Sequence, residues 1–252
     1  MSIADGVPDW TRVATQDAYR QVRRNVVDLI GQYPDSADVV VPACPEWTVL
    51  DLVEHLAGTL DLVLRRMNGA APVLTRPVNS GPPRDTPETI PTGFTTLAEL
   101  AGYWTASNDT LDRRIAAEGE PPIERLAMDA FIHEVDIRYA LGVEVPPAHP
   151  AYPVVFDVVP LGFSWSVDNL GLPALRLRTP GGSWVAGTGE PAGTVSGNRL
   201  DLLRSLVGRR SPEQIAALSW TSDPAPWLPA FTWGPFHPPE HPVEDVSAPA
   251  AA

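Results

Sequence analysis

The sequence feature that most constrains the fold is the run TVLDLVEHLAGTLDLVLRRM, residues 48–67. Apolar side chains recur in it at spacings of three and four residues, which is the period of one face of an α-helix. Thr48 and Asp51 stand at capping-box spacing, and this predicts that the helix starts there. Because a helix of this kind buries its apolar face against other helices, the run predicts a bundle. The predicted apolar face consists of Val49, Leu52, Val53, Leu56, Leu60, Val63 and Met67.

Three further segments supply the other helices of a predicted four-helix bundle. Helices are expected over residues 15–30 and 96–117, and a fourth begins with Pro121 and Pro122 in its first turn and ends at Gly142. The core positions expected on the first and third helices are Val22, Val26, Leu29, Ile30, Leu97, Leu100, Trp104 and Leu111. Residues 69–93 are rich in Pro, Thr and Gly and predict a long crossover, which lets the second and third helices run parallel.

The character of the sequence changes after residue 143, where a Pro-rich linker is followed by short apolar runs separated by glycine turns. We predict three strands and two helices in this part, at residues 175–179, 183–187, 193–197, 200–210 and 211–218. The predicted fold class is α+β, with an N-terminal four-helix bundle and a small α/β C-terminal domain. The bundle is expected to span residues 1–145 and the small domain residues 146–240, with residues 241–252 forming a disordered tail.

The formal net charge of the chain is -13 at pH 7, and no strong basic patch interrupts it. Such a surface repels phosphate backbones and anionic lipid, so neither nucleic acid nor a membrane is an expected partner. No run approaches the ~18 apolar residues that a membrane span requires, and the N-terminus lacks the features of a secretory signal. The single cysteine, Cys44, fits a reducing compartment. We therefore expect a cytoplasmic protein.

Two ionisable residues, Asp129 and His133, fall on the apolar face predicted for the fourth helix. Burying them without partners would cost several kcal/mol, so other groups must satisfy them. One explanation is a hydrogen bond between the two residues at i, i+4 spacing, or a bond from them to a neighbouring helix. The other adds His55 from the flank of the second helix, because three N/O ligands with one open position are typical of a catalytic zinc site. The poorer candidates, in Pro-rich segments, are His149, His237 and His241.

The segments CPEWTVLDLVEHLAG and MDAFIHEVDIRYALG resemble the two signature stretches of the mycothiol-dependent maleylpyruvate isomerase family, which belongs to the wider group of DinB-like four-helix metalloproteins. The resemblance is best up to residue 145, and the strand-rich part is similar to the small second domain of that family. It implies that His55, Asp129 and His133 are the metal ligands. The family usually has glutamate at the position of Asp129. The aspartate side chain is shorter by one methylene group.

The resemblance also implies a chemistry. A divalent metal, with zinc favoured, would bind a low-molecular-weight thiol, mycothiol, in its open position and hold it as the nucleophilic thiolate. The thiolate would add to a small electrophilic substrate such as an unsaturated acid, in an isomerase or an S-transferase reaction. Asp136 would orient a ligand histidine, and Arg209, which follows Gly208, would bind a carboxylate of the substrate or the cofactor.

A non-catalytic protein of the same fold, which binds a small molecule or a metal without turnover, is the alternative function. Cys44 is expected to be a small packing residue and not the nucleophile. Trp47 and Trp104 are expected to lie in the core or in a pocket wall.

Overall fold

The computed structural model describes residues 13–69, 93–119 and 121–245. The chain divides into two compact units, a helical unit over residues 13–145 and a C-terminal unit from residue 146 onward. Together they have the predicted α+β fold class, with helices in the first unit and a small sheet with helices in the second. Among the described helices, none is long and apolar enough to cross a membrane.

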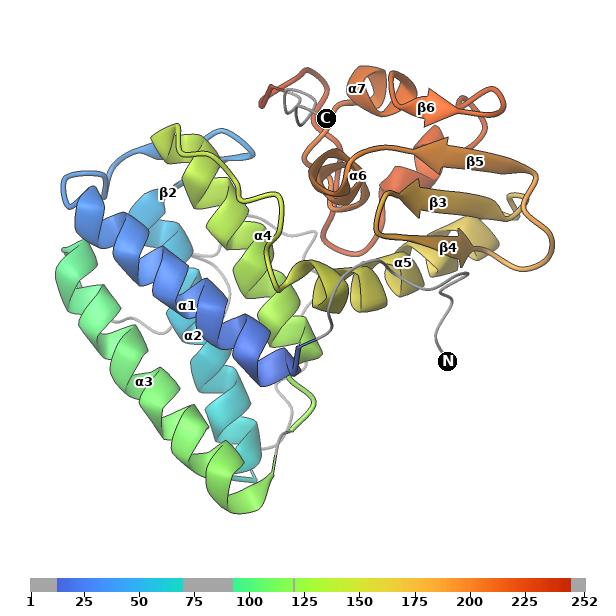
Figure 1. Ribbon diagram of the computed structural model, residues 1–252. Coiled ribbons are helices and arrows are strands. Elements are labelled where there is room, and N and C mark those ends of the chain that lie inside the picture. Colours follow the sequence, from blue (N-terminus) through green and yellow to red (C-terminus); the bar gives the residue numbers. More distant parts are fainter. Residues whose placement is uncertain (1–12, 70–92, 120, 246–252) are drawn as a thin grey trace. The chain divides into compact units, whose positions relative to one another are not determined.

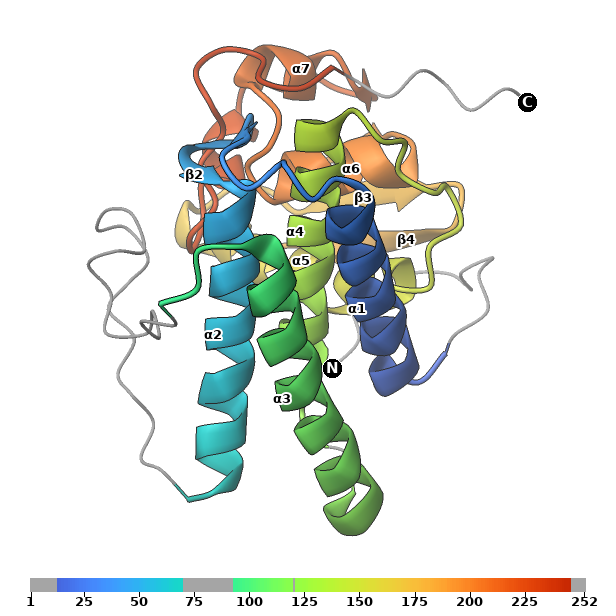
Figure 2. The same ribbon diagram turned by 90° about the vertical axis from the view of Figure 1, so that its left-hand side faces the viewer.

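Four long helices form the helical unit (Figures 1 and 2). They are α1 (Thr15–Gln32), α2 (Val49–Met67), α3 (Leu97–Glu118) and α4 (Glu124–Leu141). Both α1 and α2 pack against α3 and α4. Helices α2 and α3 run in the same direction, which the predicted long crossover allows. Arg114 near the end of α3 donates a hydrogen bond to the carbonyl of Met67 at the end of α2. The crossover predicted between them lies almost entirely outside the described residues.

The apolar face of α2 is buried as far as Leu60. Its start is the predicted one, since Thr48 accepts a hydrogen bond from the Asp51 amide while the Asp51 carboxylate accepts one from the Thr48 amide. Helix α4 also ends where expected, at a left-handed Gly142 with φ of 66°. The predicted start of α4 is wrong: Ile123 is the N-cap, so Pro121 and Pro122 precede the helix and do not form its first turn.

A short antiparallel pair of strands, β1 (Val40–Val41) and β2 (Cys44–Thr48), lies between α1 and α2. No strands were predicted here from the sequence, because Pro42 and Pro45 interrupt the short apolar run. Strand β2 runs directly into α2, and β1 packs against α4. The pair therefore connects the two helices that carry the candidate metal ligands.

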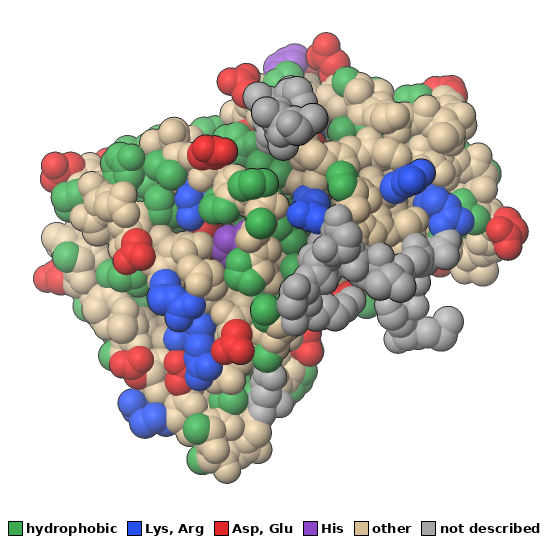
Figure 3. Space-filling view, in the orientation of Figure 1, with side chains coloured by type: hydrophobic (Ala, Val, Ile, Leu, Met, Phe, Trp, Pro, Cys, Tyr) green, Lys and Arg blue, Asp and Glu red, His purple; other side chains and the backbone are tan. Residues whose placement is uncertain are grey.

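The seam between α1 and α3 is polar. Asp112 on α3 forms ion pairs with Arg20 and Arg23 on α1, at 3.3 and 2.8 Å. Burial would raise the pKa of the Asp112 carboxyl, but the hydrogen bonds and charges of Arg23 and Arg20 lower it below its ordinary value. On the face drawn in Figure 3, basic and acidic side chains of the helical unit lie next to one another.

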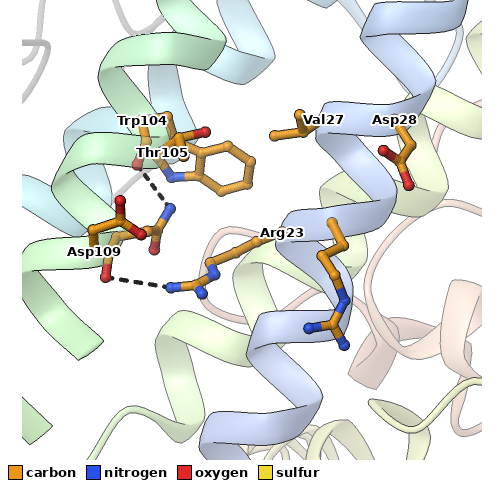
Figure 4. Close-up of a pocket in the computed structure, with 8 residues that line it drawn as sticks. Arg23, Val27, Asp28, Trp104, Thr105 and Asp109 are labelled. Atoms are coloured by element: carbon orange, nitrogen blue, oxygen red, sulfur yellow. Dashed lines mark hydrogen bonds between the residues drawn. The ribbon is translucent and has the colours of Figure 1, made fainter. Parts of the chain in front are cut away.

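A cavity of about 170 Å³ opens on the same seam. Figure 4 shows Arg23 and Val27 of α1 pointing toward α3, where Trp104, Thr105 and Asp109 line the other side of the cavity. Arg23 is held there by Asp112, and Trp104 is fully buried. The cavity is thus lined by α1 and α3, whereas the candidate metal ligands come from α2 and α4.

The C-terminal unit is a four-stranded sheet covered by helices (Figure 1). Its strands are β3 (Leu175–Thr179), β4 (Gly182–Ala186), β5 (Gly193–Ser196) and β6 (Ser219–Trp220), in the order β4-β3-β5-β6. β3 and β5 are parallel, and the other two pairs are antiparallel. The helices are α5 (Tyr152–Asn169), α6 (Arg199–Leu206), α7 (Pro212–Ala216) and the 3-10 helix η2 (Leu228–Phe231). The three predicted strands and the two predicted helices are present, with small shifts at their ends.

Helix α5 was not predicted from the sequence. Pro153 and Pro160 and the many β-branched residues around them indicate a linker followed by strands. The structure tolerates Pro153 because it lies in the first turn, where the amide has no helical partner. The Ala151 amide just before the helix donates to Nδ1 of the buried His149, so this histidine has a structural role. Phe156 of α5 stacks on Trp184 of the sheet at 4.7 Å between ring centroids.

A buried ionic cluster holds the last described segment of the chain. Glu244 pairs with Arg204 and with Arg210, the latter at 2.6 Å, and Arg210 also pairs with Asp201 at 2.9 Å. Composition favoured disorder from residue 241 onward, but it cannot reveal that one carboxylate of this stretch neutralises two buried arginines. Residues 246–252 of the expected tail lie outside the described residues.

Candidate metal centre

The structure brings together His55 of α2 and the pair Asp129 and His133, which lie one turn apart on α4. His55 Nε2 lies 3.2 Å from Asp129 Oδ2, and His133 Nε2 lies 3.6 Å from Asp129 Oδ1. One candidate ligand atom from each of the three residues lies within 4.8 Å of the other two. Residues 74 positions apart in the chain thus place two nitrogens and one carboxylate around a common point.

These distances suit zinc. Two ligand atoms at ~2.0–2.1 Å from a tetrahedral ion lie roughly 3.3 Å apart. His55 Nε2 lies 3.2 Å from one Asp129 oxygen and His133 Nε2 lies 3.6 Å from the other, and each distance is close to that separation. Two imidazoles and a carboxylate are also a donor set that zinc accepts, with a fourth position left for a small molecule. The residues present therefore fit the ion by the chemistry of their donor atoms, which lie within 4.8 Å of one another.

Asp136 contacts the ring of His133. Its Oδ2 lies 2.9 Å from His133 Nδ1, and Asp136 is completely buried. A carboxylate at this place favours the tautomer with the proton on Nδ1, which leaves the Nε2 lone pair for a metal. This is the contact that a ligand-orienting Asp136 requires.

Trp47 lies against both histidines. The centroid of its ring is 5.2 Å from that of His55, at an edge-on angle of 64°, and 6.1 Å from that of His133, at a nearly parallel 18°. The two imidazoles are themselves edge-on, 4.9 Å apart. The sequence placed Trp47 in the core or a pocket wall but gave no sign of this shared contact, because the β1–β2 pair that positions it was not predicted.

The cluster is accessible from one side. The side chains of His55 and Asp129 are 29% and 27% exposed, whereas that of His133 is 9% exposed. A small molecule can therefore reach the His55–Asp129 side of the cluster, while α4 holds the His133 side in the protein interior.

On the interior side, Tyr19 of α1 is fully enclosed. Burial raises the pKa of the Tyr19 phenol above its ordinary value; the charge of Arg23 opposes this shift and that of Asp129 adds to it. The phenol therefore stays protonated at neutral pH.

Arg209 belongs to the C-terminal unit and is 8% exposed. Its guanidinium donates to the Val207 carbonyl at 2.8 Å and lies 5.8 Å from the centroid of the Phe236 ring. Its predicted contact with a substrate or cofactor carboxylate stays a prediction.

Cys44 is half-buried in β2, the strand that also carries Trp47.

The helical unit matches a known protein family. The DinB superfamily profile matches residues 18–142, a stretch that contains all four helices of the helical unit except the first residues of α1. The helical unit therefore has a DinB-like fold. No curated protein matches the whole chain or part of it at a significant level.

Two crystal structures resemble this chain over 83% of its length. One is a histidine-to-alanine mutant of the mycothiol-dependent maleylpyruvate isomerase, with a TM-score of 0.58 and 14% identity over 83% of this chain and 92% of that chain. The other is the mycothiol-dependent maleylpyruvate isomerase, with a TM-score of 0.49 and 13% identity over the same shares, 83% and 92%. At 14% identity the first likeness shows a common fold.

Asp129 reaches both imidazoles of the cluster despite its short side chain. The resemblance raised the question of reach, because the family usually has glutamate there.

Proposed function

We propose that this protein is a metal-dependent enzyme that uses a small thiol, mycothiol, as an isomerase or S-transferase acting on a small electrophile such as an unsaturated acid. The observation that carries the proposal is the convergence of His55, Asp129 and His133 to within 4.8 Å, with one side of the cluster exposed. The DinB fold and the likeness to the maleylpyruvate isomerase support it.

Each residue of the cluster has a part in this proposal. His55, Asp129 and His133 would hold the ion. Asp136, at 2.9 Å from His133 Nδ1, would keep the proton on that nitrogen so that Nε2 can coordinate. When bound, zinc would stabilise the deprotonated form of a thiol at neutral pH. Asp129 contributes one negative charge, so the ligand set leaves the ion with a net positive charge that favours an anionic sulfur. Arg209 is proposed to pair with a carboxylate of the thiol or the substrate.

Mycothiol offered with an unsaturated acid or another electrophile tests this function. Zinc-loaded wild-type protein is expected to form a thiol conjugate, detected by mass spectrometry, or to return the isomerised acid with the thiol unchanged. The first product would identify a transferase and the second an isomerase. His55→Ala should give neither product, and glutathione in place of mycothiol is the matched control for the thiol. Tight zinc binding without any thiol chemistry would instead favour a non-catalytic binding protein.

A further inference from the structure

We propose that Trp47 is a positioning residue of the candidate metal centre, whose indole ring holds the imidazoles of His55 and His133 so that both Nε2 atoms face Asp129. The inference rests on the proposed function, because it assigns a role within the same centre.

The orientation of an imidazole depends on restraints beyond its own backbone. A histidine ring turns about two side-chain bonds, and the second of these has a broad torsional preference. His133 is restrained at Nδ1 by Asp136, a contact that leaves the tilt of the ring adjustable. An aromatic neighbour restricts that tilt, because edge-on and offset-stacked arrangements are favoured over others. Trp47 supplies such a contact to both rings at once.

The backbone of Trp47 is itself firmly placed. Trp47 directly precedes Thr48, the N-cap of α2, and the two hydrogen bonds of the capping box fix the junction between β2 and the helix. Strand β2 pairs with β1, and β1 packs on α4. Trp47 is therefore tied to α2, which carries His55, and also to α4, which carries His133.

The same contact favours the metal-loaded state. An imidazole bound to a divalent ion carries part of the positive charge of that ion, and the face of an indole attracts positive charge. The indole is nearly parallel to the His133 ring, at 18°, so it offers this face to the more buried of the two imidazoles.

Zinc affinity, measured by competition with a chromophoric chelator, tests the role of Trp47. Outer-shell substitutions at metal sites weaken metal binding by ~10–100-fold. We expect Trp47→Ala to weaken zinc binding by about tenfold, at the low end of that range, because no hydrogen bond is lost. Trp47→Phe should stay near wild type, since an aromatic ring remains. Trp165→Ala removes a tryptophan that is 66% exposed on α5, and it should leave zinc affinity unchanged.

Fluorescence provides a second measurement that does not depend on how well Trp47→Ala folds. Cobalt(II) bound at the cluster should quench Trp47 emission, because the indole contacts two of the ligand rings. The chain has eight tryptophans, so the wild type should lose a fraction of its emission. In Trp47→Phe, which should still bind cobalt, most of the decrease in emission should disappear. In Trp165→Phe the decrease should be as large as in the wild type.

The outcomes separate this inference from the proposed function. Wild-type zinc affinity in a folded Trp47→Ala, or undiminished cobalt quenching in Trp47→Phe, would overturn the role of Trp47 alone and leave the metal centre in place. A wild-type protein that binds neither zinc nor cobalt would overturn both.

Discussion

Asp129 Oδ2 lies 3.2 Å from His55 Nε2, although the two residues belong to different helices and stand 74 positions apart in the chain. A hydrogen bond between Asp129 and His133, both on α4, is the simpler explanation of why these two polar residues lie on an apolar helix face. The presence of His55 at the same carboxylate makes the arrangement a three-donor cluster.

Replacing Asp136 tests how far the orientation of His133 matters. Asp136→Ala removes the acceptor from His133 Nδ1 in a fully buried place, so zinc affinity should fall by ~10–100-fold. Asp136→Asn keeps an acceptor oxygen but loses the charge, so its loss should be smaller. Chelator competition measures both variants. Equal affinities in wild type and Asp136→Ala would mean that Asp136 does not act on the metal centre.

The charge of Asp129 should matter more than its length. Asp129→Asn has nearly the same shape but cannot supply a negative ligand, and its zinc affinity should drop by more than the ~10–100-fold typical of outer-shell changes. Asp129→Glu should stay within about tenfold of wild type, because a longer carboxylate reaches at least as far. Isothermal titration calorimetry with zinc compares the two. A reversed order, with Asn the better ligand, would contradict a carboxylate-bound ion.

The ion pairs of Asp112 predict a pH dependence of stability. Because the pKa of Asp112 is lowered in the folded state, its contribution is present above the unfolded-state pKa of ~4 and is lost as pH falls through the lower folded-state value. Asp112→Asn should reduce the free energy of unfolding by roughly 1 kcal/mol at pH 7. The difference between the two proteins should shrink in urea titrations below pH 4. A difference that is constant from pH 7 to pH 3 would argue against these ion pairs.

The buried cluster around Glu244 should be important for the stability of the C-terminal unit. Glu244→Ala leaves Arg204 and Arg210 without their shared carboxylate in a buried place, and such a loss costs about 3–5 kcal/mol. Glu240→Ala, at an exposed position four residues away, should change stability by less than ~0.5 kcal/mol. Urea denaturation followed by circular dichroism compares the variants. Similar midpoints for the two would show that Glu244 is dispensable.

Local signals in the sequence were sufficient for the helices of the bundle. The capping box at Thr48 and the glycine at position 142 mark helix ends through interactions with neighbouring residues, and both were read correctly. Helix α5 was missed because proline and β-branched residues count against a helix locally. Its stability comes from packing on the sheet, through contacts such as Phe156 with Trp184, which no local pattern reveals.

The three candidate ligands could be predicted from the sequence, whereas the contact of Trp47 with them could not. Asp129 and His133 were conspicuous because polar residues on an apolar helix face need partners, and His55 stood on the flank of another amphipathic helix. The contact of Trp47 with both rings depends on the strand pair β1–β2, whose pairing joins residues that carry no periodic pattern. A tryptophan directly before a helix cap, eight residues ahead of a candidate ligand, was the available signal.

The zinc content of the purified protein tests the central claim most directly. Elemental analysis after extensive dialysis should find close to one zinc ion per wild-type chain, and that zinc should be absent from His55→Ala and from His133→Ala. His149→Ala, which removes a buried histidine outside the cluster, should keep its zinc. A wild-type chain that holds no divalent metal, or zinc that persists in both cluster variants, would contradict the account.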